Sequence, residues 1–85
     1  MGEKKKEEIK KQIIKLFENR KYSTIETKDY LLQVEVYDKL NNKMVINMFS
    51  EQETTAFFID NDVDELTGEY KIFEIKQVKK WNVIY

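Results

Sequence analysis

The chain has no cysteine, no histidine and no proline, and only two glycines among its 85 residues. Without cysteine it can form neither a disulfide framework nor a thiolate metal site, which favours a reducing, cytoplasmic location. Without histidine it lacks the side chain whose ordinary pKa suits acid-base work near neutral pH. Two glycines are too few for a glycine-rich phosphate loop or a dinucleotide motif. We therefore expect no enzyme, no bound metal and no cofactor.

Long apolar runs are also missing. The longest, Ala56 to Ile59, is far shorter than the roughly 20 residues that a membrane-spanning helix needs. The N-terminus carries positive charge, but no apolar stretch follows it as in a secretory signal. The apolar and charged fractions, 41% and 36%, are typical of a folded domain with a charged surface. We expect a small soluble domain over residues 1–85 that does not contact a membrane.

A helical pattern covers the first quarter of the chain, from about Lys4 to Arg20. At about 100° per residue, four apolar side chains fall on one arc of this helix, with Ile14 at its edge. Three consecutive lysines stand near the positive end of the helix dipole, so we expect residues 1–5 to fray. The apolar arc consists of Ile9, Ile13, Leu16 and Phe17.

From Tyr22 onward the apolar spacing changes to every second residue, and β-branched and aromatic residues become frequent. This pattern predicts strands over 22–27, 30–37 and 43–49, with turns at Lys28-Asp29 and at Leu40-Asn41-Asn42. In the strand 30–37 one face is apolar and the other mostly polar. The apolar face comprises Tyr30, Leu32, Val34 and Val36, and the opposite face Gln33, Glu35 and Tyr37.

The second half of the chain is less regular. Ser50-x-x-Glu53 has the form of a helix capping box, but the residues after it favour a strand, which we expect over 50–59. Residues 60–68 suit an acidic connection, with one helical turn at 63–66 as an option and a positive φ angle at Gly68. Apolar residues recur at every third position in 70–85. A bulge near Lys76-Gln77 would fit that spacing to one bent strand or to two strands meeting at a corner.

These elements predict an α+β domain, with one N-terminal amphipathic helix packed on an antiparallel β-meander of about five strands and a curl toward a half-barrel as an option. The apolar arc of the helix should pack on the apolar face of the sheet. The sheet residues expected in this core are Leu32, Val34, Val36, Met44, Ile46 and some of Phe57, Ile59, Ile72, Ile75 and Trp81.

Further apolar residues fall on the strand faces opposite this core, and one helix can cover only one face of a sheet. Either the sheet curls into a small barrel, or its uncovered face forms a homodimer or binds another protein. The residues concerned are Leu31, Val45, Phe49 and Phe58.

Charge is sorted along the chain although the net charge is only −1. Residues 50–69 carry seven carboxylates and no lysine or arginine, which is more one-sided than a solvated strand face usually is. This segment predicts a non-catalytic protein-binding module, such as a stoichiometric inhibitor or adaptor for a basic partner like a nucleic-acid-binding protein. The binding residues expected are Glu51, Glu53, Asp60, Asp62, Asp64, Glu65 and Glu69.

The N-terminal helix supports an alternative, because residues 1–21 hold eight basic side chains against four acidic ones. Lysines could contact phosphates, and nearby tyrosines could stack on bases, in a nucleic-acid-binding accessory protein. A simpler explanation of these lysines is that the outer face of the helix is exposed to water, and the low pI of about 5.5 favours it. The residues for this alternative are Lys4, Lys5, Lys6, Lys10 and Lys11.

The run Asp60-x-Asp62-x-Asp64 resembles the opening of a calcium-binding loop. Glycine should then stand at the sixth position and glutamate at the twelfth, where this chain has Glu65 and Lys71. The pattern therefore favours a solvated acidic turn over a metal site.

Overall fold

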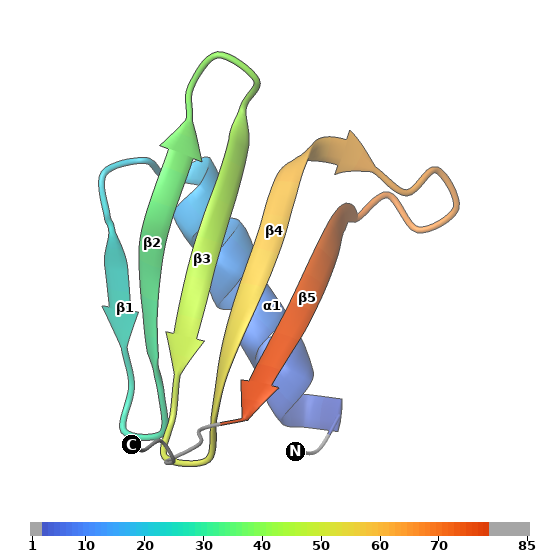
Figure 1. The fold of residues 1–85 in the computed structure, drawn as a ribbon. Coiled ribbons are helices and arrows are strands. Elements are labelled where there is room, and N and C mark those ends of the chain that lie inside the picture. The colour runs from blue at the N-terminus through green and yellow to red at the C-terminus, as the bar shows by residue number, and fades with distance from the viewer. Residues whose placement is uncertain (1–2, 79–85) are drawn as a thin grey trace.

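The structure is a computed structural model that describes residues 3–78, and the side chains of residues 4–75. One helix packs on a five-stranded antiparallel sheet whose strands follow one another in sequence order (Figure 1). The α+β meander predicted from the sequence is confirmed, and the sheet is not closed into a barrel, with β1 and β5 as its edges. The elements are α1 (Glu3–Glu18), β1 (Thr24–Glu26), β2 (Leu31–Asp38), β3 (Lys43–Phe49), β4 (Glu53–Val63) and β5 (Tyr70–Val78).

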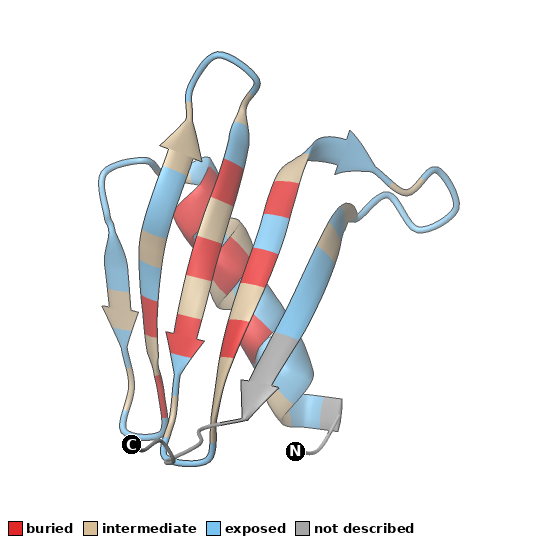
Figure 2. Cartoon of the chain, viewed as in Figure 1, coloured by how far each residue is buried: buried red, intermediate tan, exposed pale blue. Residues whose placement is uncertain are grey.

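The core lies between α1 and one face of the sheet, which we call the inner face (Figure 2). Ile13 and Leu16 are fully buried, and the other two residues of the predicted apolar arc are almost so. This burial confirms the helical spacing, because residues three and four apart share one face of a helix. The sheet side of the core consists of Tyr30, Leu32, Met44, Ile46, Met48, Phe57 and Ile59.

A bulge in β2 overturns the prediction that Val36 lies in the core. The pairing of β2 with β3 shifts between Val34 and Val36, so that Val36 pairs with Val45 on the opposite face, which we call the outer face. Val36 is therefore 49% exposed. Tyr37, predicted on the polar face, packs against the core instead. One extra residue in a strand exchanges the faces of every side chain that follows it.

The bulge expected in the C-terminal strand β5 is absent there, and the irregular pairing lies in the neighbouring strand β4. Pairing between β4 and β5 continues without a shift from Ile72 to Val78, so no bulge occurs at Lys76-Gln77. The register shifts instead in β4, between Ile59 and Val63. Because β5 alternates regularly, Ile72 packs against the core while Ile75 points outward and is 54% exposed, against the prediction that admitted it to the core. Trp81, also expected there, lies outside the described residues.

Three tight turns are built as the residue types suggest. Ser50 does not cap a helix, because strand β4 follows it from Glu53; its hydroxyl accepts from the backbone N–H of Glu53 at 3.2 Å within the β3–β4 turn. Thr27 does the same for Tyr30 at 3.1 Å in the β1–β2 turn. Asn42 has a φ angle of 54°, in the left-handed region that asparagine tolerates. The strand chosen over residues 50–59 is thereby confirmed, as β4 begins at Glu53.

The C-terminal end of α1 is fastened to the sheet by aromatic contacts. Phe17 meets the ring of Tyr70 edge to face, with ring centroids 5.4 Å apart. The guanidinium of Arg20 lies 5.1 Å from the centroid of Phe17 and 4.5 Å from that of Tyr37. The hydroxyl of Tyr70 donates to Glu18 at 3.1 Å. Such pairs add to the apolar burial, so they fix where the helix ends on the sheet.

Candidate functional site

The sheet separates the acidic segment 50–69 into two groups at opposite ends of β4. Glu51 lies in the β3–β4 turn and Glu53 begins β4, while the other five carboxylates follow at its far end (Figure 1). Residues 60–63, predicted as part of a loop, continue β4 instead. The sequence thus predicted one acidic surface where the structure forms two. We call the larger group the acidic turn; it contains Asp60, Asp62, Asp64, Glu65 and Glu69.

Hydrogen bonds fix the backbone of the acidic turn. The carboxylate of Asp60 accepts from the backbone N–H of Asp62 at 2.8 Å, and that of Asp64 accepts from Leu66 at 2.8 Å. The N–H of Gly68 donates to the carbonyl of Asp64 at 2.7 Å, which closes a single turn rather than a helix at this point. Gly68 has the expected positive φ, 76°. The turn therefore presents its charges in a defined arrangement.

The acidic turn has two basic neighbours on the adjacent strands, Lys43 opposite Asp60 and Lys71 beside Asp62. Within residues 4–75, the only ion pair that it makes joins Asp62 to Lys71 at 3.5 Å, and both side chains are about half exposed. An exposed pair of this kind is worth at most about 1 kcal/mol, so it barely offsets the repulsion among the carboxylates. No three carboxylates in the described part of the chain are grouped so as to hold a metal ion. The turn suits a diffuse basic surface better than a single cation.

Leu66 stands at the tip of the acidic turn with 96% of its surface exposed. Val63, where the strand ends, is 40% exposed. Single exposed apolar residues are common on protein surfaces, but one that shares a turn with several carboxylates has the pattern of an interface anchor with a polar rim. The sequence predictions did not include Leu66. The sequence holds a signal that could have identified it, because Leu66 is an apolar residue within a segment that is otherwise rich in carboxylates.

The basic residues of α1 are only partly available for a ligand. Lys5 pairs with Asp29 at 2.8 Å, and Lys6 lies 3.8 Å from Glu74. The hydrogen bond and the charge of Lys5 hold the pKa of Asp29 below its ordinary value. Two of the five lysines assigned to nucleic-acid binding therefore already have acidic partners. The other three, Lys4, Lys10 and Lys11, are exposed.

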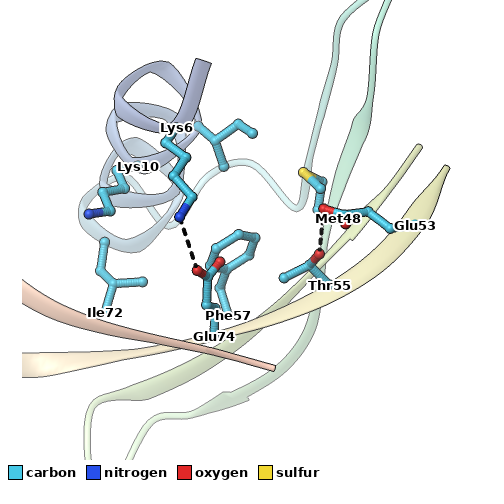
Figure 3. Close-up of a pocket in the computed structure, with 9 residues that line it drawn as sticks. Lys6, Lys10, Met48, Glu53, Thr55, Phe57, Ile72 and Glu74 are labelled. Carbon is cyan, nitrogen blue, oxygen red and sulfur yellow. Dashed lines mark hydrogen bonds and ion pairs between the residues drawn. The ribbon is translucent and has the colours of Figure 1, made fainter. Parts of the chain in front are cut away.

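A small hollow of about 100 Å³ opens between the first turns of α1 and strands β4 and β5 (Figure 3). Its floor is apolar, and two polar pairs border it: Lys6 points to Glu74, and the hydroxyl of Thr55 donates to Glu53 at 3.3 Å. Ligand pockets usually measure about 300–1,000 Å³, so this hollow is too small for a typical substrate. It is lined by Lys6, Ile9, Lys10, Met48, Glu53, Thr55, Phe57, Ile72 and Glu74.

Among the residues that line this hollow, Thr55 and Glu53 most resemble a nucleophile paired with a base, because they join a hydroxyl to a carboxylate. Apart from Tyr30, Thr55 is the only residue with a polar side chain that is buried in the described core, and it is 1% exposed. A working nucleophile needs access to substrate and a base that a third group orients. Thr55 is covered, and Glu53 accepts only from Thr55 among the described side chains. The arrangement is therefore that of a buried hydroxyl whose hydrogen bond is satisfied.

Tyr30 has an unusual environment at the same end of the molecule. Its side chain is 6% exposed, and its hydroxyl finds no hydrogen-bond partner in the described part of the chain. Burial raises the pKa of Tyr30 above its ordinary value of 10.0, and the carboxylates of Glu8 and Asp29 add to this effect. Folding therefore favours the protonated phenol, which is lost only in alkaline solution.

This shift predicts a pH dependence of stability that Tyr30→Phe removes. A pKa raised in the folded state gives a contribution that is complete below about pH 10 and is lost as the pH rises through the folded pKa. The free energy of unfolding of the wild type should fall more steeply above pH 10 than that of the variant, measured by urea denaturation. At pH 7 the two should agree within about 1 kcal/mol, since the hydroxyl makes no bond.

Tyr22→Phe is the matched control, because Tyr22 is 55% exposed. It should keep the wild-type dependence on pH. Identical alkaline curves for the wild type and the Tyr30 variant would contradict the assignment to Tyr30.

Comparison with known proteins adds no relative: no protein family model, no curated protein and no solved structure matches this chain. Within residues 3–78, no helix is long and apolar enough to cross a membrane. The function must therefore be argued from the surfaces described above.

Proposed function

We propose that this domain is a non-catalytic protein-binding module whose acidic turn contacts a basic surface of a partner protein. The observation that carries the proposal is a fully exposed leucine at the tip of a turn that holds five carboxylates and makes one ion pair among the described residues. Glu51 and Glu53 take no part in this surface, because they lie at the other end of β4. The homodimer expected from the sequence is a separate proposal, because it uses the outer face of the sheet.

Each part of the acidic turn has a role in such a contact. The carboxylates raise the association rate with a basic partner, because opposite charges steer the encounter. They also discriminate against acidic surfaces. Leu66 supplies apolar area, and complete burial of a leucine contributes about 1.5–3 kcal/mol. The partner should therefore offer a shallow apolar pocket bordered by lysine or arginine, and the basic face of a nucleic-acid-binding protein is one candidate.

The test uses labelled peptides in which arginine and lysine surround one leucine or phenylalanine. The triple variant D60N/D62N/D64N should bind about tenfold more weakly or worse, a loss of about 1.4 kcal/mol, measured by fluorescence anisotropy. Asparagine keeps an acceptor oxygen, so the bonds of Asp60 and Asp64 to the backbone can persist, and circular dichroism checks the fold. Leu66→Ser should weaken binding without changing its salt dependence.

The control removes the same charge elsewhere, in E7Q/E26Q/E51Q, three exposed carboxylates outside the acidic turn. It should retain most of the affinity. Equal losses in the two triple variants would show that net charge alone matters and would overturn the proposal. The nucleic-acid alternative gains support only if oligonucleotides bind at about 50 mM salt and K10Q/K11Q weakens that binding.

A further inference from the structure

The outer face of the sheet is apolar across four strands, and no element of the described chain covers it (Figure 1). Residues that pair across β2 to β5 form rows on this face. One row is entirely apolar: Val36 pairs with Val45, Val45 with Phe58, and Phe58 with Phe73. The sequence prediction of a second apolar face is confirmed, and the bulge in β2 enlarges it by adding Val36.

The neighbouring rows are neutral. One runs through Gln33, Asn47, Ala56 and Ile75, and the next joins Leu31, Phe49 and Thr54. The one carboxylate near the centre, Glu35, accepts a hydrogen bond from Asn47 at 2.7 Å. Charged side chains stand at the margins of the face. Glu26 pairs with Leu31 at the β1 edge, and Lys43 pairs with Asp38 and with Asp60 at one end. Asp60 therefore belongs to the acidic turn and also borders the outer face, whose centre offers little to a strongly charged partner.

The face carries both a protrusion and a hollow. Phe73 and Ile75 on the edge strand β5 are 65% and 54% exposed. Beside them lies a broad hollow of about 510 Å³, formed by the strands β2, β3 and β4. Its lining residues are Glu35, Val36, Val45, Asn47, Phe49, Thr54, Ala56 and Phe58.

We infer that the outer face is the interface of a homodimer, in which Phe73 of each copy inserts into the hollow of the other. A two-fold contact requires a surface that complements itself, and a protrusion beside a hollow on one face meets that requirement. Two sheets packed face to face lie about 10 Å apart, which leaves room for one layer of interdigitated side chains.

The exposed area is sufficient for such a contact. Five large apolar residues of this face are between 36% and 65% exposed: Val36, Phe49, Phe58, Phe73 and Ile75. At about 200 Å² for a large side chain, they present on the order of 500 Å² of surface in each copy. Adding the polar residues between them brings each side near the roughly 800 Å² that a specific interface buries per partner. A smaller or scattered patch would not support a dimer.

The test measures the mass of the full chain by sedimentation equilibrium from about 1 µM to about 1 mM, a range that spans moderate and weak dissociation constants. The wild type should change from monomer to dimer within this range. Phe73→Glu should raise the dissociation constant at least tenfold, because it places a charge in the hollow of the partner. Ile75→Lys serves as a second variant if Phe73→Glu fails to fold by circular dichroism.

Leu40→Glu is the matched control, an exposed apolar residue in the β2–β3 turn with 92% of its surface accessible. It should dimerise as the wild type does. The inference is overturned if the wild type stays monomeric at every concentration. It is also overturned if the Phe73 and Ile75 variants dimerise as strongly as the wild type. Leu66→Ser, which changes the acidic turn but no residue of the outer face, should not change the dimer, which separates this contact from the proposed function.

Discussion

Leu16→Ala should lower the free energy of unfolding by about 2–5 kcal/mol, the range for a leucine removed from a packed core. Leu16 is fully buried on the helix arc that meets the sheet, so truncation leaves a cavity that the rigid strands cannot close. A domain of this size holds only about 5–10 kcal/mol in total. The variant should therefore unfold at a temperature at least about 10 °C lower in a circular dichroism melt.

Two leucines give matched controls for this prediction. Leu40 and Leu66 are 92% and 96% exposed, so the same substitution at either position should change stability by less than about 0.5 kcal/mol. A similar loss in all three variants would mean that burial in the core does not decide the result. Leu66→Ala also separates folding from binding, because it removes the proposed anchor and leaves the core intact.

Phe17→Ala should cost about 3–5 kcal/mol, because Phe17 combines burial with two specific contacts. Its ring is 2% exposed, meets Tyr70 edge to face and lies against the guanidinium of Arg20. Without the ring, the last turn of α1 loses its aromatic contact with Tyr70 of β5. Chemical denaturation measures the loss, and hydrogen exchange should show that the amides of residues 14–18 open more readily.

Two milder variants divide the effect of Phe17 into its parts. Phe17→Leu keeps most of the apolar area but no aromatic contact, so it should cost less than half as much as Phe17→Ala. Tyr70→Phe removes only the hydrogen bond to Glu18, which is exposed, and should cost at most about 1 kcal/mol. If Phe17→Leu were as damaging as Phe17→Ala, the aromatic contacts would outweigh the burial.

The order of elements and most of the core could be predicted from spacing alone. Ile9, Ile13, Leu16 and Phe17 are buried as the helical period requires, and Leu32, Met44 and Ile46 face them as the strand period requires. These patterns hold because each is local, repeating every turn or every second residue. The two largest errors, Val36 and Ile75, have non-local causes. A bulge in β2 reverses the faces beyond it, and the regular pairing of β5 with β4 places Ile75 outside.

The candidate site was predictable only in part. The carboxylates of residues 50–69 are plain in the sequence, but their division into two groups depends on β4 extending to Val63 between them. The basic helix shows the converse, since Asp29 and Glu74 are distant in sequence from Lys5 and Lys6 yet pair with them. Charge counts along a chain cannot reveal such pairs, because they form between elements.

The sequence by itself determined that this is one amphipathic helix with a β-meander, since local periodicity fixes which residues each element must bury. It also determined the acidic segment and the lack of histidine, cysteine and glycine-rich loops. Only the tertiary structure decided which face each strand residue joins, because one unpaired residue in a ladder exchanges the two faces. It also decided that Leu66 stands alone among carboxylates, and that Phe73 stands beside a hollow which a second copy can fill.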